Sequence, residues 1–250
     1  MQIEVVTLFP ALIEAGLAAG IVGRALAAGR LAVGTATPRS HAPLPHRSVD
    51  DRPFGGGPGM VLQPAPIAAA IRAAAARLPP GAPMIGLSAQ GRRFTQAEAR
   101  RLAALPAFGL VAGRYEGIDQ RVSDALIDAE LSIGDYVLSG GELPALVVID
   151  AVARLLPGVL GDEDSAAQDS FGDGLLDWPH YTRPEAWEGH RVPEVLVGGN
   201  HAAIGRWRLM QALGRTWQLR PDLLRERSLT DNERQLLEEY CAAEGIEPPR

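Results

Sequence analysis

The stretch 109–144 contains two loops marked by glycines, and these loops could hold a small ligand. An apolar run from residue 109 stops at Gly113, and the pair Gly140-Gly141 precedes a predicted helix. Glycine has no Cβ, so its backbone can turn tightly or approach a ligand closely. Small molecules bind at strand ends in α/β proteins. The spacing fits a ligand site, and it equally fits ordinary turns after strands, with one short helix and one short strand between them.

Two common phosphate-binding loops are excluded by the residue types. A P-loop requires Gly-Lys-Ser or Gly-Lys-Thr, and this chain has 24 arginines and no lysine. The Gly-x-Gly-x-x-Gly motif of dinucleotide-binding folds is also missing from this stretch. A nucleotide-type pocket here must therefore be of another kind.

A second candidate site is the long polar segment 38–60, which is rich in proline and glycine. Several charged and titratable residues precede its three consecutive glycines, namely Arg39, His46, Arg47, Asp50, Asp51 and Arg52. Loops of this length in compact domains are usually functional or disordered. Such groups could hold phosphates or an RNA base, or they could belong to a mobile surface loop.

Composition predicts a cytoplasmic globular protein without a membrane segment. The 250 residues suit one large domain or two modest ones, and 46% of them are hydrophobic. The longest apolar runs are too short to span a membrane, and the first residues lack the basic cluster of a signal peptide. A single cysteine, Cys241, excludes an intramolecular disulfide and a cysteine-based zinc site.

The charge distribution leaves nucleic-acid binding open. A net charge of −6 argues weakly against it. Residues 183–227, however, contain eight arginines and five acidic residues. A solvated helix face or a surface for RNA would both explain this local excess.

Alternating apolar segments predict the fold class. Strands are expected at 2–8, 31–35, 84–87 and 109–112, and helices at 11–28, 64–78, 95–104 and 142–156. Strands that alternate with helices indicate a mainly parallel sheet with helices on both faces. Thr95 and Glu98 suggest a capping box, and Gln90-Gly91 suggests a turn.

Residues 158–174 are small, acidic and without regular pattern, which is typical of an interdomain linker. An aspartate there, such as Asp169, is expected to be solvated and idle. Helices are predicted beyond the linker, with Asn200 capping one helix and Thr230 with Glu233 forming a capping box for another. The sequence suggests that Trp187, Trp207 and Trp217, or at least two of them, pack inside this part, although aromatic residues among arginines can also stack on RNA bases.

Five motifs resemble the bacterial tRNA (guanine-N1)-methyltransferases, the TrmD family of the SPOUT class. They are HRSVDDRPFGGGPGM (46–60), GRYEGID (113–119), SIGDYVLSGGELP (132–144), DSFGDGLLDWPHYTRP (169–184) and GNHAAIGRWR (199–208). Their order and spacing match the family over nearly the whole chain.

The resemblance implies an α/β fold with a mainly parallel sheet and a deep C-terminal trefoil knot, followed by a small all-α domain. The implied domains are a knotted catalytic domain (1–160), a flexible linker (161–174) and a helical tRNA-binding domain (175–250). The knot would comprise residues 87–90, 109–117 and 132–141. A homodimer with active sites shared between subunits is also implied.

The resemblance further implies that the knot loops bind S-adenosylmethionine. The expected cofactor-binding residues are Leu87, Ser88, Gly113, Tyr115, Glu116, Gly117, Ile133, Gly134, Asp135, Tyr136, Val137, Leu138, Gly140, Gly141 and Pro144. A magnesium requirement belongs to the family as well. Glu116 is the candidate for it, although the sequence shows no cluster of metal ligands.

The catalytic pair comes from the same resemblance, which reverses the expectation that Asp169 is idle. N1 of guanine carries a proton that must leave before methylation, and Asp169 would be the general base. Arg154, near the end of the helix after Gly140-Gly141, would stabilise the charge that develops on O6. On its position alone, Arg154 is also an ordinary basic residue at a helix C-terminus.

The implied substrate is guanine 37 of tRNA, next to the anticodon and preceded by guanine 36, whose methylation maintains the reading frame. Expected RNA-binding residues are His46, Asp50, Gly59, Ser165, Arg183, His201 and Arg208. Two alternatives stay open. One is a knotted methyltransferase acting on another RNA nucleotide, and the other is a catalytically silent RNA-binding protein that keeps S-adenosylmethionine as a structural ligand.

Four residues depart from the usual motifs of the family: Ser40, Phe54, Ala89 and Gly198. Ala89 replaces a proline beside the expected cofactor pocket, and the other three stand in or beside segments expected to contact tRNA. These departures concern details of cofactor and tRNA contacts rather than the reaction.

Overall fold

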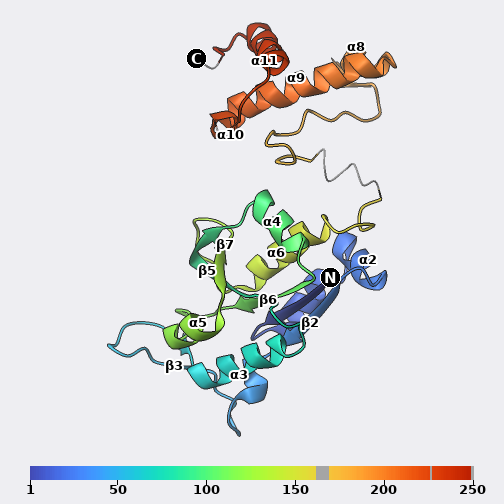
Figure 1. The fold of residues 1–250 in the computed structure, drawn as a ribbon. Helices are drawn as coiled ribbons and strands as arrows, with labels where there is room; N and C mark the ends of the chain where they lie inside the picture. The colour runs from blue at the N-terminus through green and yellow to red at the C-terminus, as the bar shows by residue number, and fades with distance from the viewer. Residues whose placement is uncertain (162–168, 226, 249–250) are drawn as a thin grey trace. The chain divides into compact units, whose positions relative to one another are not determined.

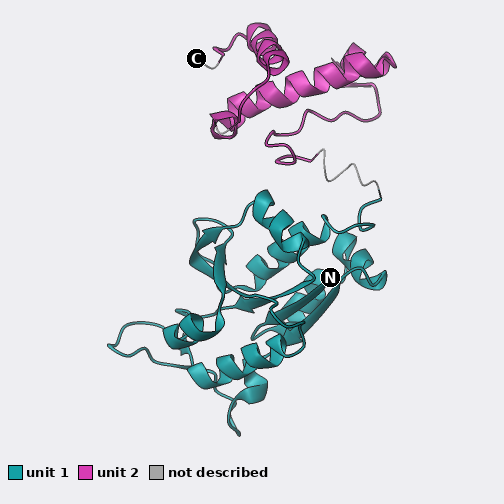
Figure 2. Ribbon diagram, viewed as in Figure 1, with its two compact units in different colours: residues 1–163 teal, residues 164–250 magenta. Residues whose placement is uncertain are grey.

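A computed structural model describes residues 1–161, 169–225 and 227–248. The chain divides into two compact units, Met1–Glu163 and Asp164–Arg250 (Figure 2). Residues 162–168 of the predicted linker, including Ser165, lie outside the described residues. Unit 1 and unit 2 are described separately.

Unit 1 is built on a five-stranded sheet in the order β2-β1-β6-β5-β7, and every neighbouring pair is parallel (Figure 1). The strands are β1 (Gln2–Val6), β2 (Ala32–Ala36), β5 (Met84–Arg93), β6 (Ala107–Ala112) and β7 (Ala129–Ser132). Every residue of the central strand β6 is buried, as expected for a parallel strand covered on both faces. The prediction of a mainly parallel sheet is confirmed.

Helices cover both faces of this sheet (Figure 1). On one face pack α1 (Pro10–Leu17), α2 (Gly20–Ala27), α4 (Gln96–Ala103) and α6 (Glu142–Ala153). The other face is covered by α3 (Pro64–Ala75) and α5 (Gln120–Leu126). Successive residues of β6 alternate between the two cores, since Phe108 and Leu110 join the first while Ala107 and Val111 join the second.

Two local predictions in unit 1 are wrong. The helix predicted at 11–28 is two helices, bent by 92° at a break where Gly20 adopts a φ of +68°. Gln90-Gly91 lies inside strand β5 rather than in a turn. The register shifts there, so that Leu87 and Arg92 both pair with Leu131. A Cβ at Gly91 would lie 2.5 Å from the Leu131 nitrogen, which explains why glycine occupies this bulge.

The polar segment 38–60 is partly ordered by short elements. It contains the 3₁₀ helix η1 (Pro38–His41) and the strand β3 (Asp50–Asp51), which pairs with β4 (Val61–Leu62). Its C-terminal end is tied to the loop after β6: Glu116 N–H donates to Met60 O and Leu62 N–H donates to Gly117 O, both at 2.9 Å. The segment therefore ends beside one of the two glycine loops.

A buried polar network joins β1, the loop after β6 and the start of α6. The Glu142 side chain is fully buried, and its carboxylate accepts hydrogen bonds from Thr7 Oγ1 and Arg114 Nε, each at 2.8 Å. Arg114 Nη1 also donates to Ser139 O at 3.0 Å, and its guanidinium lies 4.5 Å from the centre of the Phe9 ring. The network therefore fixes the loop that precedes α6.

Unit 2 is mainly helical. Its helices are α8 (Glu194–Val197), α9 (His201–Leu219), α10 (Pro221–Arg225) and α11 (Asp231–Glu244). It also contains a short antiparallel hairpin of β8 (Ala186–Trp187) and β9 (His190–Arg191), which must be added to the expected all-α domain. None of the described helices is long and apolar enough to cross a membrane alone.

The core of unit 2 forms between α9 and α11, where Leu213, Leu237 and Cys241 are buried. The predicted caps are confirmed, because Asn200 caps α9 and Thr230 with Glu233 forms the capping box of α11. Trp217 packs against this core, whereas Trp187 is 63% exposed. The prediction that Trp187 packs inside is therefore wrong.

We expect Glu142→Ala to destabilise unit 1 by about 3–5 kcal/mol, because it leaves the Arg114 guanidinium without its buried partner. Urea unfolding followed by circular dichroism measures the loss. Tryptophan fluorescence gives an internal reference, since all four tryptophans belong to unit 2. The control is Asp135→Ala, which breaks an exposed ion pair with Arg93. Equal stability of the two variants would contradict this role for Glu142.

Candidate functional site

The glycine loops come together around a cavity of about 480 Å³ in unit 1. Its walls come from residues 86–90 of β5, the loop after β6 and the loop after β7. The loops lie at the carboxyl ends of β6 and β7, where ligands bind in parallel sheets. The cavity lies within the usual size range of small-molecule sites. Of the two interpretations of these glycines, the structure favours a ligand site.

Fourteen of the residues expected to bind the cofactor line this cavity. They are Leu87, Ser88, Gly113, Tyr115, Glu116, Gly117, Ile133, Gly134, Tyr136, Val137, Leu138, Gly140, Gly141 and Pro144. Asp135 is the exception, because it is not among the lining residues and its exposed carboxylate pairs with Arg93 at 2.7 Å. The structure thus brings together residues that are up to 57 positions apart in the sequence.

Unusual backbone conformations shape two walls of the cavity. Tyr115 has a φ of +61°, which is uncommon for a residue with a side chain. Two backbone hydrogen bonds hold the loop around Tyr115 in this conformation: Glu116 N–H donates to Met60 O, and Leu62 N–H donates to Gly117 O. In the opposite wall Gly134 has a φ of +153°, and a Cβ on it would lie 2.4 Å from the Tyr136 ring. The loop after β6 is therefore held by the neighbouring segment 60–62, whereas the loop after β7 is shaped by contacts among its own residues.

Sequence reasoning missed a third wall of the cavity. Gln120, Ser123, Ile127 and Glu130 also line it, and they come from α5, the connection after it and strand β7. Gln90 Nε2 donates to Glu130 Oε2 at 3.0 Å across this wall. The spacing of these residues carries no motif, so only the parallel pairing of β5 with β7 could have revealed them.

The two candidate catalytic residues belong to different units. Arg154 is half-buried in unit 1, where it forms the C-cap of α6. Asp169 is half-buried in unit 2, and its carbonyl accepts a hydrogen bond from Gly172 N–H at 2.9 Å. Each residue is thus placed within its own unit.

Asp169 stands close to a second carboxylate in unit 2. Ser170 Oγ accepts a hydrogen bond from Asp177 N–H at 3.0 Å, which joins the two ends of the segment 169–177. Burial raises the pKa of the Asp177 carboxyl above its ordinary value, and the negative charge of Asp169 adds to this rise. The segment therefore concentrates negative charge around the candidate base.

The expected RNA-binding residues fall in two places. In unit 1, His46, Asp50 and Gly59 belong to the polar segment 38–60, and a Cβ on Gly59 would lie 2.1 Å from Glu116 Oε1 beside the cavity. In unit 2, Arg183, His201 and Arg208 are exposed, while Ser165 lies outside the described residues. The Arg208 guanidinium lies 4.9 Å from the centre of the Trp178 ring.

The four departures from the family motifs have different surroundings. Ala89 lines the cavity, so its effect would be on the cofactor pocket. Phe54 and Ser40 are exposed, and Gly198 is the C-cap of α8. Among the described residues, no three His, Cys, Asp or Glu side chains are grouped as they would be around a metal ion.

Comparison with known proteins gives one consistent result. Residues 1–226 match the family model described as tRNA (Guanine-1)-methyltransferase TrmD. A tRNA (guanine-N(1)-)-methyltransferase from Methylococcus capsulatus is 58% identical over 240 residues, which cover 96% of each chain. A protein of the same name from Coxiella burnetii (strain RSA 493) is 56% identical over 95% of this chain and 96% of its own. Another, from Alcanivorax borkumensis, is 57% identical over 96% of this chain and 92% of its own. The chain is therefore a member of the TrmD family of tRNA (guanine-1)-methyltransferases.

Proposed function

We propose that this protein is a cytoplasmic enzyme that transfers a methyl group from S-adenosylmethionine to N1 of guanine 37 in tRNA, and so maintains the reading frame. The observation that carries the proposal is the cavity at the strand ends. The chain belongs to a methyltransferase family, and the glycine-rich segments expected to bind the methyl donor line this cavity. The motifs DSF (169–171) and HYTRP (180–184) favour guanine 37 over other RNA positions.

S-adenosylmethionine, with a flat base and a polar tail, is the ligand proposed for the cavity. Its walls combine exposed backbone at glycines with apolar side chains such as Leu87, Leu138 and Ile133. Segments 87–90, 109–117 and 132–141 would form the knot and hold the adenine through main-chain groups. When bound, S-adenosylmethionine supplies a methyl group that is already activated by its sulfonium. Glu116 is the candidate contact for magnesium.

The residues of the chain would act on guanine rather than on the donor. Asp169 takes the proton from N1, so that the N1 lone pair can bond to the methyl carbon as the carbon–sulfur bond breaks. Negative charge develops on O6 during this step, and Arg154 stabilises it. The guanine must leave the stacked anticodon loop to reach these groups.

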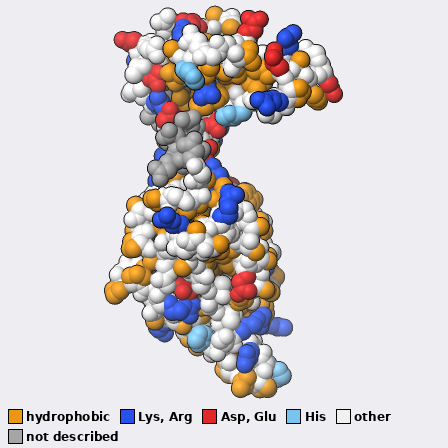
Figure 3. All heavy atoms as spheres, turned by 90° about the vertical axis from the view of Figure 1, so that its right-hand side faces the viewer, with side chains coloured by type: hydrophobic (Ala, Val, Ile, Leu, Met, Phe, Trp, Pro, Cys, Tyr) orange, Lys and Arg blue, Asp and Glu red, His pale blue; other side chains and the backbone are white. Residues whose placement is uncertain are grey.

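Recognition of tRNA would use both units. His46, Asp50 and Gly59 lie on the segment that ends beside the cavity, where they would read guanine 36 and its neighbour. Arg183, His201 and Arg208 would contact the tRNA from unit 2, together with Ser165. Figure 3 shows arginine and histidine side chains among hydrophobic ones on the visible face of unit 2.

A homodimer with shared active sites completes the proposal. Unit 1 exposes Phe9 and Leu12 near α1 and Leu143 and Val147 on α6. The helices α1 and α6 are in contact, and the four side chains are 39–50% exposed. An exposed apolar surface of this kind is typical of a protein–protein interface.

Transfer of labelled methyl groups to paired tRNA transcripts tests the function. One transcript carries guanines at 36 and 37, and the other carries adenine at 37. We expect labelling of the first transcript alone, mapped to N1. Labelling of both would discard the position, and no labelling despite cofactor binding would favour the silent RNA-binding protein.

Asp169→Asn should bind the cofactor normally and fail to transfer the methyl group, and a fully active variant would contradict its role as base.

Val147→Arg should disrupt the dimer, because it places a charge in the middle of the proposed apolar interface. We expect sedimentation velocity to show a dimer for the natural protein and a monomer with little activity for the variant. Val197→Arg is the matched control, since Val197 is exposed to a similar extent (54%) but belongs to unit 2. A fully active monomer would contradict shared active sites.

A further inference from the structure

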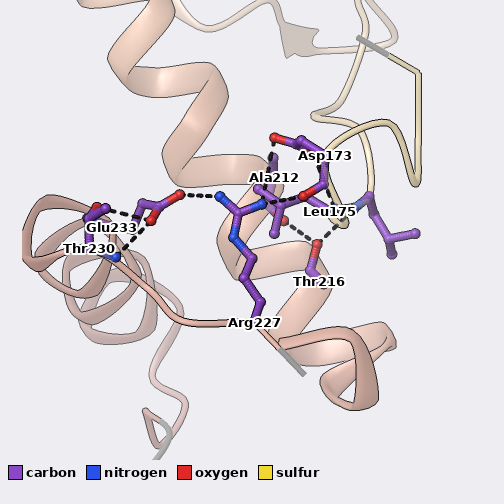
Figure 4. Close-up of polar contacts among 8 residues, drawn as sticks. Asp173, Leu175, Ala212, Thr216, Arg227, Thr230 and Glu233 are labelled. Atoms are coloured by element: carbon purple, nitrogen blue, oxygen red, sulfur yellow. Dashed lines mark hydrogen bonds and ion pairs between the residues drawn. The ribbon is translucent and has the colours of Figure 1, made fainter. Parts of the chain in front are cut away.

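We propose that Thr216 and Arg227 are positioning residues for Asp169. They fasten the segment 169–177 to helices α9 and α11, so that the proposed base is carried by unit 2 (Figure 4). This inference rests on the proposed function, which makes Asp169 the general base.

Thr216 holds one end of the segment from the middle of the unit 2 core. It is fully buried, and its hydroxyl donates to Ala212 O at 2.6 Å, one helical turn earlier in α9. This bond uses the hydroxyl proton and leaves the oxygen free to accept from Leu176 N–H at 2.8 Å (Figure 4). The Thr216 hydroxyl therefore connects the backbone of the segment to the rigid backbone of α9.

Arg227 holds the middle of the segment. Its guanidinium donates to the carbonyl of Asp173 and lies 3.8 Å from the Asp173 carboxylate. On its other side it pairs with Glu233, which is buried and belongs to the capping box at the start of α11 (Figure 4). Burial acts to raise the pKa of Glu233, but hydrogen bonds from Thr230 and Arg227 hold it below its ordinary value. A charged Glu233 thus keeps Arg227 directed at the segment.

Bonds within the segment transmit this anchoring to Asp169. Phe171 N–H donates to Leu175 O at 2.7 Å, and Leu175 is buried in the unit 2 core. Gly172 N–H donates to Asp169 O at 2.9 Å, and Asp177 N–H donates to Ser170 Oγ at 3.0 Å. Asp169 therefore begins a closed loop whose far end is fixed by Thr216 and whose middle is fixed by Arg227.

The arrangement has a consequence for catalysis. Helix α9 begins at His201, includes Arg208 and reaches Thr216, so two of the proposed RNA contacts share one helix with the residue that anchors the segment of Asp169. Contacts of tRNA with α9 would then fix the position of the RNA relative to Asp169. A small displacement of a catalytic group can reduce a rate by about 100-fold.

The test compares Thr216→Val with Thr216→Ser. Valine keeps the shape of threonine but cannot accept from Leu176 N–H, while serine keeps the hydroxyl. We expect Thr216→Val to lower kcat for methyl transfer by about 10- to 100-fold, with little change in KM for S-adenosylmethionine. Thr216→Ser should retain a kcat within about threefold of the natural enzyme. Hydrogen exchange of residues 170–177 should become faster in the valine variant alone.

The matched control is Glu239→Gln, which removes the ion pair between α11 and Arg206 of α9 without touching the segment. It should leave kcat unchanged, and all assays are run below the unfolding transition that tryptophan fluorescence reports for unit 2. A Thr216→Val enzyme with normal kcat, beside an inactive Asp169→Asn enzyme, would overturn this inference alone. So would equal losses in the valine and serine variants. An active Asp169→Asn enzyme would overturn the proposed base and this inference together.

Discussion

The buried ion pair between Glu142 and Arg114 is the interaction on which the cavity of unit 1 depends. A fully buried carboxylate is tolerated only where charged and polar partners satisfy it, and here Thr7 and Arg114 do so. Because Thr7 follows β1, Arg114 follows β6 and Glu142 begins α6, the pair fixes three segments at one end of the sheet. The further bond from Arg114 to Ser139 O then places the loop that closes the cavity. Glycine is required beside it, since a Cβ at Gly141 would lie 2.6 Å from the Ala112 Cα. The buried network holds this loop so close to β6 that residues with a side chain would not fit in place of the glycine pair.

The two units divide the proposed chemistry between them. Unit 1 holds the preformed cavity and Arg154, while unit 2 holds Asp169 and the arginines proposed to contact tRNA. The cavity is shaped by main-chain geometry, whereas the segment that carries Asp169 is fastened by side chains of α9 and α11. An enzyme built this way can bind its methyl donor with one unit and present the base with the other. Proton removal would then depend on the bound tRNA.

Local signals in the sequence located the main strands and the helix caps of unit 2, but they missed the break between α1 and α2 at Gly20. The apolar alternation located the parallel sheet, and the capping box at 230–233 forms as predicted. The box at 95–98 forms only in part, because Thr95 accepts from Glu98 N–H while the Glu98 carboxylate binds Arg92 and Arg101 instead. Arg101 is a local partner, three residues after Glu98 in α4, whereas Arg92 belongs to β5. The contact with Arg92, like the bulge at Gln90-Gly91, depends on tertiary structure that spacing does not show. The roles proposed for the site residues came from motif resemblance, since position alone suggested an idle, solvated Asp169.

Titration of S-adenosylmethionine into the protein without tRNA tests most directly whether the strand-end cavity is the methyl-donor site. Isothermal calorimetry on the natural protein should show saturable binding, and Gly140→Ala should weaken it at least tenfold, because the new Cβ would lie 2.2 Å from Arg114 Nε beside the cavity. Gly161→Ala is the matched control, since a Cβ there meets open space, and it should bind as the natural protein does. Equal binding by all three proteins, or no binding by the natural one, would contradict the assignment of the cavity.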